Sequence, residues 1–344
     1  MSFRILTTSC VVACAIICSG DDQVRDIGLV LSGGGAKGAY EVGVWTAMCE
    51  AGIDKRVRCI SGTSVGSINA VLFASVSNPA LCESFWLEVV PNFANPNKKH
   101  MLSIVSGITG REGIATITAR ILQKKAESLG LDVTDLSSAD EEEARSRAIQ
   151  EWKRNVASNG AAMAVNSIKS FRSTNDVLHG FADVANFRRL LSERIPDKWA
   201  LDSVAVYATA LEKGVWNKTI FRIDHQPKER VVDAIIASSS IPLFFDSQEI
   251  DGKVYVDGGL AFGGDNVPLN PILENHPEVK TLIVVCLSAK STTGKRGLVE
   301  IMPSKPLGGL DAVFDTSPET ARRLIDLGRK DARKVLTEAG MVKE

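Results

Sequence analysis

The chain has 344 residues, of which 44% are hydrophobic, enough for one large packed core. Forty basic residues against forty-one acidic ones leave a formal charge of −1, so nothing favours nucleic acid as a partner. The seven cysteines show no paired C-x-x-C spacing, so neither a metal site nor a disulfide framework is indicated. No apolar run approaches the roughly 20 residues of a membrane-spanning helix.

The first 20 residues form a segment of their own. Arg4 is followed by a short apolar stretch, residues 5–18, and then by Ser19 and Gly20. A basic start, an apolar stretch and small residues are typical of a secretory signal peptide. The letters VVAC at 11–14 also resemble a bacterial lipoprotein cleavage box. Either kind of signal predicts that the protein is exported or membrane-anchored. If the segment is instead an uncleaved extension, the protein is expected to be cytoplasmic and peripheral to membranes.

Short apolar strands alternate with helices from residue 27 onward. Ile27–Leu31 and Val57–Ser61 are apolar runs followed by glycine, as in strands buried on both faces. Helical patterns follow them at Ala39–Glu50 and Val65–Ser75. This order predicts βαβ units and a mainly parallel sheet. Later strands are expected at Ser203–Leu211, Thr219–Ile223, Lys253–Val256 and Thr281–Leu287, and later helices at Lys228–Ser238 and Pro318–Glu338.

Residues 97–200 differ from the segments on either side. They include a charged helical stretch at Asp140–Ala157 and small, glycine-containing stretches at Ser106–Gly113 and Val156–Ala164. This composition indicates a helical insertion on one side of the sheet.

Three consecutive glycines separate the first strand from its helix. Glycine is kept where the backbone must turn sharply or approach another group closely. Gly33-x-Gly35-x-x-Gly38 matches the dinucleotide-binding pattern, which also needs an acidic residue at the end of the next strand. The acidic residue in range, Asp54, precedes that strand instead. The loop therefore favours the alternative, in which glycine N–H groups stabilise an oxyanion.

The second strand ends in a nucleophile-elbow pattern, Gly62-Thr63-Ser64-Val65-Gly66. The small residues Gly62 and Gly66 allow Ser64 to project from a sharp turn. Its hydroxyl then lies at a helix N-terminus, where the helix dipole favours negative charge. The N–H of Val65 is expected to donate to an oxyanion, and the glycine loop is expected to supply the other donors, at Gly33, Gly34 and Gly35.

A serine nucleophile needs a base, and Asp257 is the best candidate. It ends a strand and precedes Gly258 and Gly259, which permit close approach to another turn. His276 is the one histidine after Asp257, so a Ser–Asp–His triad is the alternative. The polar residues around it, ENHP at 274–277, indicate a surface turn and favour a direct pair of Ser64 and Asp257. The remaining histidines have no distinctive local pattern: His100, His179 and His225.

In this order, the glycine loop, the elbow and the Asp257-Gly258-Gly259 turn resemble the patatin-like phospholipase family. The approach to the aspartate, ASSSIPLFFDSQEIDGKVYVDGG at 237–259, and LIDLGRKDARKVL near the end are also similar to that family. The resemblance covers about residues 27–272, with 273–344 as a strand and helix packed on the same domain. It implies an α/β fold, a three-layer αβα sandwich with a mainly parallel sheet and the insertion at about 97–200.

The resemblance also implies an activity, that of a lipid acyl hydrolase with a Ser–Asp dyad. Ser64 would be the nucleophile, Asp257 its base and Gly33–Gly38 the oxyanion loop, without a metal ion or organic cofactor. The glycines that support these motifs would be Gly38, Gly62, Gly66, Gly258 and Gly259. Lys37 either meets a lipid phosphate or is a solvent-exposed loop lysine. The chain departs from the family at Gly263-Gly264-Asp265, a slightly longer stretch after the aspartate.

The expected partner is a lipid at a membrane or micelle surface, and the insertion is expected to cover the acyl pocket and contact that surface. Two alternatives stay open: an acyltransferase or thioesterase that uses the same dyad, and a non-catalytic lipid-binding protein. The sequence does not indicate an oligomeric state.

Overall fold

The structure, a computed structural model, describes residues 24–93 and 184–342, apart from short gaps at 202, 242–244, 261–262, 289–292, 294–296 and 310. The expected N-terminal signal lies outside the described residues. So does the expected insertion up to residue 183, including the charged helix at 140–157.

Every strand and helix expected in the described part of the chain is present, with ends within two residues of those predicted. The strands are β1 (Ile27–Leu31), β2 (Val57–Thr63), β3 (Ala205–Glu212), β4 (Lys218–Arg222), β5 (Gln248–Ile250), β6 (Lys253–Asp257), β7 (Thr281–Val285) and β8 (Val299–Ile301). The α-helices are α1 (Ala39–Glu50), α2 (Val65–Val76), α3 (Pro79–Ser84), α7 (Val184–Arg194), α8 (Lys228–Ser239), α9 (Asn270–Asn275) and α10 (Pro318–Glu338). Short helical turns occupy Gly35–Gly38, Asp54–Arg56, Phe85–Val89, Val90–Phe93 and Asp311–Val313.

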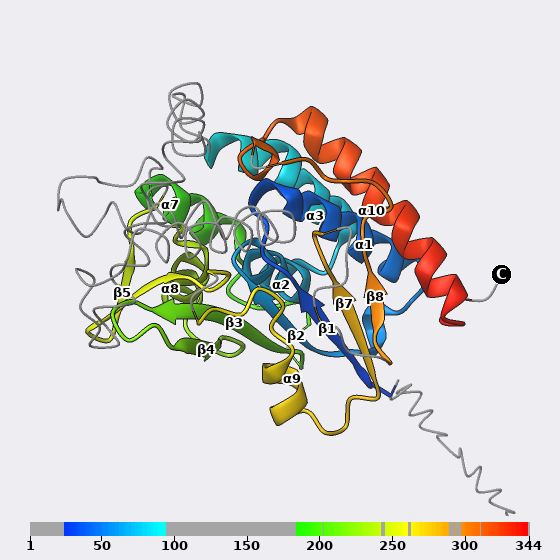
Figure 1. The fold of residues 1–344 in the computed structure, drawn as a ribbon, viewed down its shortest axis with the longest axis horizontal. Coiled ribbons are helices and arrows are strands. Elements are labelled where there is room, and N and C mark those ends of the chain that lie inside the picture. Colours follow the sequence, from blue (N-terminus) through cyan, green and yellow to red (C-terminus); the bar gives the residue numbers. More distant parts are fainter. Residues whose placement is uncertain are drawn as a thin grey trace, which may run out of the picture.

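The strands form one mainly parallel sheet, as the sequence predicts (Figure 1). Its order is β5-β6-β3-β2-β1-β7-β8, with β4 paired to β3. Strands β3, β2, β1, β7 and β8 run parallel to one another. Strands β4 and β6 each pair antiparallel with β3, and β5 pairs antiparallel with β6. The β1-α1-β2 and β2-α2 connections supply the helices that parallel pairing requires.

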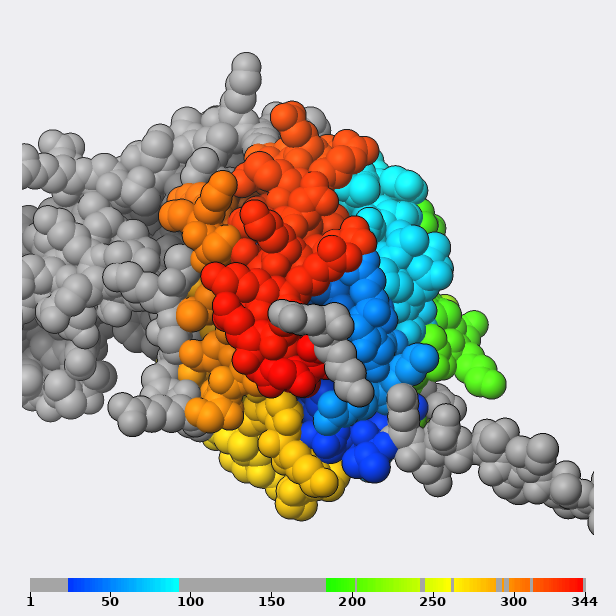
Figure 2. Space-filling view, turned by 90° about the vertical axis from the view of Figure 1, so that its right-hand side faces the viewer, coloured from blue at the N-terminus to red at the C-terminus, as the bar shows by residue number. Residues whose placement is uncertain are grey.

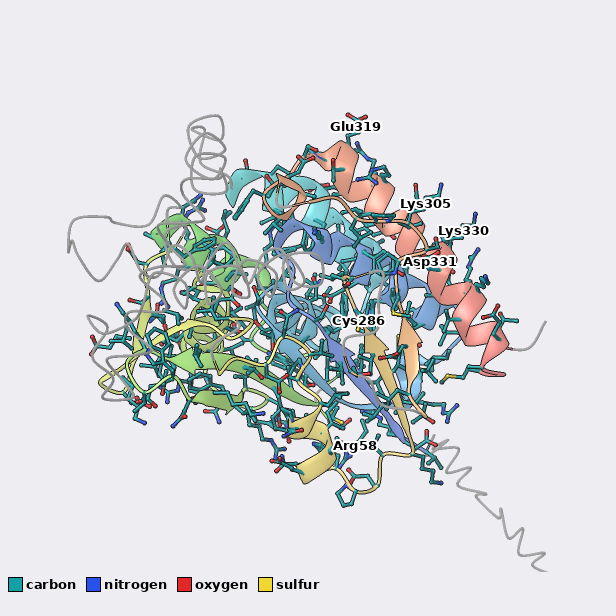
Figure 3. All side chains as sticks on the ribbon, in the orientation of Figure 1. Arg58, Cys286, Lys305, Glu319, Lys330 and Asp331 are labelled. Atoms are coloured by element: carbon teal, nitrogen blue, oxygen red, sulfur yellow. The ribbon has the colours of Figure 1, made fainter. Side chains whose placement is uncertain are left out.

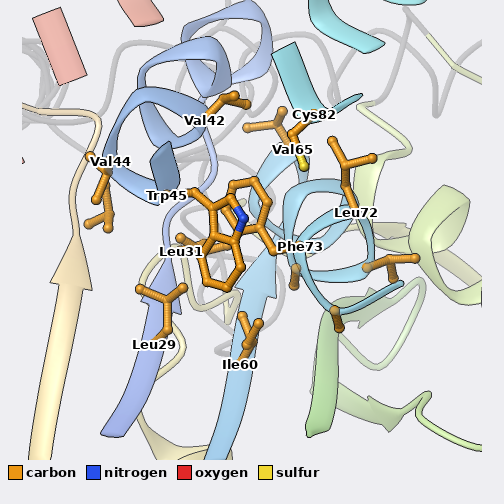
Figure 4. Close-up of a cluster of buried hydrophobic side chains, with 14 of the residues drawn as sticks. Leu29, Leu31, Val42, Val44, Trp45, Ile60, Val65, Leu72, Phe73 and Cys82 are labelled. Carbon is orange, nitrogen blue, oxygen red and sulfur yellow. The ribbon is translucent and has the colours of Figure 1, made fainter. Parts of the chain in front are cut away.

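Alternate residues of β1 enter cores on opposite faces of the sheet, because side chains along a strand point alternately up and down. Leu29 and Leu31 join the large core beneath α1, α2 and α8, whereas Val30 joins a smaller core beneath α9. In the large core, Trp45 of α1 stacks on Phe73 of α2 with ring centroids 4.8 Å apart (Figure 4). Helices therefore cover both faces of the sheet, and the predicted α/β class is confirmed.

Helix α10 forms an outer layer on α1, and Figure 2 shows it lying across the surface beside that helix. Two glycines permit the close contact: a Cβ on Gly43 of α1 would collide with the Ile325 carbonyl oxygen, and one on Gly328 of α10 with that of Tyr40. The buried Asp331 accepts a hydrogen bond from Tyr40 Oη at 3.2 Å. In Figure 3, Asp331 lies on the inner side of α10, and Lys330 and Glu319 lie on its outer side.

We expect Gly43→Ala to destabilise the protein by about 1–3 kcal/mol, the usual cost of overpacking. Alanine has the higher helix propensity, so a loss of stability would come from the collision with α10. Urea denaturation measures the difference, and Arg322→Ala, on the exposed side of α10, is the control with an expected change within about 0.5 kcal/mol. A Gly43→Ala protein as stable as the wild type would contradict this packing of α1 and α10.

Candidate active site

Strands β2 and β6 meet end to end along one edge of β3. Thr63, the last residue of β2, pairs with Thr209, and Asp257, the last residue of β6, pairs with Ala210. Strand β4 pairs with both Thr209 and Ala210, so it occupies the other edge of β3. Since β2 runs parallel to β3 and β6 antiparallel, their carboxyl ends converge. The register therefore brings Ser64, which follows Thr63, next to Asp257.

The two side chains are in direct contact. Ser64 Oγ donates a hydrogen bond to Asp257 Oδ2 at 2.5 Å, and each residue is 4% exposed. The other carboxylate oxygen, Oδ1, accepts a hydrogen bond from the Gly259 N–H at 2.7 Å. Burial raises the pKa of Asp257 to about 6, against the opposing effect of the hydrogen bonds from Ser64 and Gly259. A carboxylate with this pKa is a better base than an exposed aspartate.

Ser64 has a strained backbone, with φ 55° and ψ −127°, a region that residues other than glycine rarely adopt. Helix α2 begins at the next residue, so the Ser64 hydroxyl lies at a helix N-terminus. A Cβ on Gly62 would collide with the Gly66 carbonyl oxygen, and one on Gly66 with that of Leu31. Both glycines of the elbow are therefore required by close backbone contacts.

The glycine loop lies beside the serine. A Cβ added to Gly33 would lie 3.1 Å from the Cβ of Ser64. The Gly33 N–H, however, donates to the Asn266 carbonyl oxygen at 3.1 Å. The expectation that all three glycines offer free donors is therefore wrong for Gly33, because its N–H already has an acceptor in the protein. Gly34 and Gly35 remain candidates from this loop, together with Val65 of the elbow.

The outer side of the loop packs against the C-terminal part of the chain. Lys37 Nζ donates to the Gly308 carbonyl oxygen at 2.9 Å. A Cβ on Gly35, which has a φ of 60°, would collide with the Val313 carbonyl oxygen. On the inner side, a Cβ on Gly38 would collide with the side chain of Val65. Lys37 thus contacts protein backbone, and its contact with a lipid phosphate stays a prediction.

The segment after Asp257 folds back towards the glycine loop. The Asp265 N–H donates to the Gly258 carbonyl oxygen at 2.8 Å, which places Asn266 between the loop and the turn. Asn266 Nδ2 donates to the Gly33 carbonyl oxygen at 3.3 Å, and a Cβ on Gly259 would lie 2.5 Å from Asn266 Oδ1. The Gly263-Gly264-Asp265 stretch, which is slightly longer than in the family, thus belongs to the turn that places Asn266 beside the glycine loop. Nothing in the local sequence marked Asn266 as a site residue.

A buried carboxyl group lies behind the glycine loop. Glu41, in the first turn of α1, accepts a hydrogen bond at Oε2 from Asn69 Nδ2 at 2.8 Å. Asn69 Nδ2 also donates to the Gly38 carbonyl oxygen at 3.0 Å, and Asn69 Oδ1 accepts from Trp86 Nε1 at 3.0 Å. Burial raises the pKa of Glu41 well above its ordinary value. Burial therefore favours the neutral form of Glu41, which supports the end of the loop through Asn69.

The hydrogen-bond and ion-pair partners of the described histidines do not include Ser64 or Asp257. His276 is 8% exposed, so the expected surface turn is wrong: the residue follows the end of α9, and its ring is buried against Tyr207. One ring nitrogen lies 3.0 Å from Tyr207 Oη and the other 3.0 Å from Glu278 Oε1. Arg58, which binds Glu278, lies beside α9 in Figure 3. His225 is exposed next to Asp224, and the other two histidines lie outside the described residues.

In the described part of the chain, no cluster of His, Cys, Asp or Glu side chains has the arrangement needed to hold a metal ion. None of the helices described there is both long and apolar enough to cross a membrane.

We expect the stability of the wild type relative to Glu41→Gln to fall as the pH rises. Above the ordinary glutamate pKa of about 4.3 the unfolded chain loses a proton that the folded chain keeps. The difference in unfolding free energy should then change by up to about 1.4 kcal/mol per pH unit until the folded group ionises. Urea denaturation at about pH 5 and about pH 8 measures it. A difference that does not change with pH would show that Glu41 is ionised in the folded protein.

Comparisons with known proteins identify the family of the chain. The family model for patatin-like phospholipases matches residues 29–273. A lysophospholipase nte1 of Aspergillus terreus is 52% identical over 50 residues, 14% of this chain and 3% of that protein. The patatin-like phospholipase domain-containing protein ZK370.4 of Caenorhabditis elegans is 47% identical over 58 residues, 17% of this chain and 4% of that protein. The chain thus matches only a small part of the length of these curated relatives.

Among solved structures, VipD from Legionella pneumophila aligns with 91% of this chain and 67% of its own, with a TM-score of 0.45 and 14% identity. The type III effector ExoU aligns with 91% of this chain and 53% of its own, with a TM-score of 0.40 and 17% identity. The family match spans most of the chain and contains the glycine loop, the elbow and the aspartate turn. The protein belongs to the patatin-like phospholipase family.

Proposed function

We propose that the protein is a lipid acyl hydrolase that cleaves carboxylic esters of phospholipids or other acyl lipids through an acyl-serine intermediate. The observation that carries this proposal is the 2.5 Å hydrogen bond from Ser64 Oγ to the buried carboxylate of Asp257. Membership of the patatin-like phospholipase family supports a lipid as the substrate class. The Aspergillus relative is named a lysophospholipase, which supports the same class.

In the acylation step, Ser64 Oγ attacks the carbonyl carbon of the ester while its proton moves to Asp257 Oδ2. The carbonyl oxygen becomes a tetrahedral oxyanion, for which Gly34, Gly35 and Val65 are the proposed N–H donors. One well-placed donor of this kind contributes about 3–4 kcal/mol to the transition state. When the intermediate collapses, the C–O bond to the alcohol breaks and the alcohol leaves with the proton from Asp257.

In the deacylation step, water attacks the acyl-serine and transfers a proton to Asp257. The second tetrahedral intermediate uses the same donors. Its collapse breaks the bond to Ser64 Oγ, which takes the proton back from Asp257, and releases a fatty acid. Both steps balance with one carboxylate, one hydroxyl and water. The raised pKa of Asp257 suits this cycle, because the residue must accept and return a proton in each step.

Ser64→Ala and Asp257→Asn should each abolish hydrolysis of a p-nitrophenyl ester and of a mixed phospholipid and neutral-lipid panel. The amide introduced by Asp257→Asn would keep the hydrogen bond from Gly259 and remove a buried charge, so this variant should melt no lower than the wild type at about pH 8. His276→Gln, which can still bond Tyr207, is the control and should keep most of the activity. An active Ser64→Ala enzyme would overturn the assignment, and an inactive, well-folded His276→Gln enzyme would replace the dyad by a triad.

The pH profile of kcat/KM should show an acid limb centred near pH 6, where Asp257 takes up a proton. The protonated carboxyl cannot accept the Ser64 proton, so activity should fall as the pH drops below that value. Hydrolysis of a monomeric ester from about pH 4 to about pH 9 measures the limb. A limb centred near the ordinary aspartate pKa, about 4, would show that Asp257 is not desolvated in the working enzyme.

A further inference from the structure

Three consecutive serines lie at the end of α8, next to the dyad, and all three are buried. Their hydroxyl groups have different partners. Ser240 Oγ donates to the Ile236 carbonyl oxygen at 2.8 Å, back along its own chain segment. Ser239 Oγ has no hydrogen-bond partner among the described residues. Of the three, Ser238 alone places its hydroxyl against the backbone of Ser64.

Ser238 Oγ has hydrogen-bond partners on two segments, strand β3 and the nucleophile elbow. It donates its proton to the Thr209 carbonyl oxygen of β3 at 2.6 Å. Because its one proton is used there, the oxygen acts only as an acceptor on its other side. That side accepts the N–H of Ser64 at 2.9 Å. The hydroxyl therefore links the nucleophile elbow to β3, the strand that also pairs with β6.

The same segment also holds the acid. The Ser238 carbonyl oxygen accepts the Gly258 N–H at 3.2 Å, and the Ser240 carbonyl oxygen accepts the Asp257 N–H at 2.9 Å. A Cβ on Gly258 would collide with the Thr209 carbonyl oxygen, the same oxygen that receives the Ser238 proton. The backbone N–H groups of Ser64 and Asp257 thus both donate hydrogen bonds to residues at the end of α8.

We propose that Ser238 is a positioning residue for the Ser64–Asp257 pair. Its hydroxyl holds the Ser64 backbone in the strained conformation from which Oγ reaches the carboxylate. Ser238 contacts neither the reacting Oγ nor the carboxylate through its side chain, so it acts through the backbone of Ser64. This inference rests on the proposed function of the dyad.

The test compares Ser238→Ala with Ser238→Thr, which keeps a hydroxyl, and with Ser239→Ala, the adjacent buried serine whose hydroxyl is unpartnered in the described structure. Ser238→Ala should lower kcat for a monomeric ester by about 100-fold with KM changed less than about twofold, because a displacement near 1 Å costs that much. The acid limb of its kcat/KM profile should move to higher pH. The hydrogen bond from Ser64 lowers the pKa of Asp257, so weakening that bond should raise this pKa. Ser238→Thr should recover activity to within about tenfold of the wild type, and Ser239→Ala should match the wild type.

Circular dichroism and thermal melting establish that each variant is folded. If Ser238→Ala does not fold, Ser238→Cys replaces it, because a thiol fills the space but is a weak acceptor, and the same losses are expected. Equal losses in Ser238→Ala and Ser239→Ala would overturn the proposal. So would a change confined to KM, an unshifted acid limb, or failure of Ser238→Thr to recover activity.

The outcomes also separate this inference from the proposed function. An inactive wild-type protein, or an active Ser64→Ala variant, overturns both. An active wild type with an inactive Ser64→Ala variant and an unimpaired Ser238→Ala variant overturns the role of Ser238 alone.

Discussion

The candidate site depends on a single strand, β3, whose edge holds the ends of two others. Ser64 and Asp257 are 193 positions apart in sequence, yet their side chains share one short hydrogen bond. Their strands converge because β2 and β6 pair with adjacent residues of β3 in opposite directions. A shift of either strand by one residue would turn its side chains to the other face. The register of the sheet thus fixes the contact between Ser64 and Asp257.

This arrangement costs stability in two ways. Ser64 has a positive φ, a conformation that costs of order 1–3 kcal/mol in a residue other than glycine. Asp257 is a buried carboxyl group whose raised pKa records the loss of solvation of its charge. Large apolar cores on both faces of the sheet offset these costs. The hydrogen bonds of Ser238, Ser240 and Gly259 hold the strained segments in place.

Most of the fold follows from local sequence patterns, and the exceptions have physical reasons. The long helix α10 begins at a capping residue, Ser317, whose side chain accepts the Thr320 N–H. Strands β5 and β8 have three residues each, too few to show a period. Helix α9 was missed because it has only six residues, and the burial of His276 was missed because its sequence neighbours are polar. The ring of His276 is buried against Tyr207 of β3, which lies 69 positions earlier, so no local pattern reveals the contact.

The residues of the site that belong to sequence motifs could be predicted, whereas contacts between distant segments could not. Ser64 and Asp257 were predicted as a pair because a nucleophile elbow and a strand-ending aspartate have small neighbours, and the two side chains are in contact. The occupation of the Gly33 N–H could not be predicted, because its acceptor belongs to Asn266, more than 200 residues later. Ser238 carried no signal of its own, because it is one of three consecutive serines at the end of α8. Its role depends on Thr209 and Ser64, which only the folded chain brings near.

The central claim is that Asp257 makes the Ser64 oxygen nucleophilic. Reaction with a fluorophosphonate, followed by peptide mapping with mass spectrometry, tests it directly because it requires neither the natural lipid nor turnover. We expect the adduct on the peptide that contains Ser64, formed at least about 100-fold more slowly in Asp257→Asn than in the wild type. An adduct on another residue, or equal labelling rates in Asp257→Asn and the wild type, would contradict the claim.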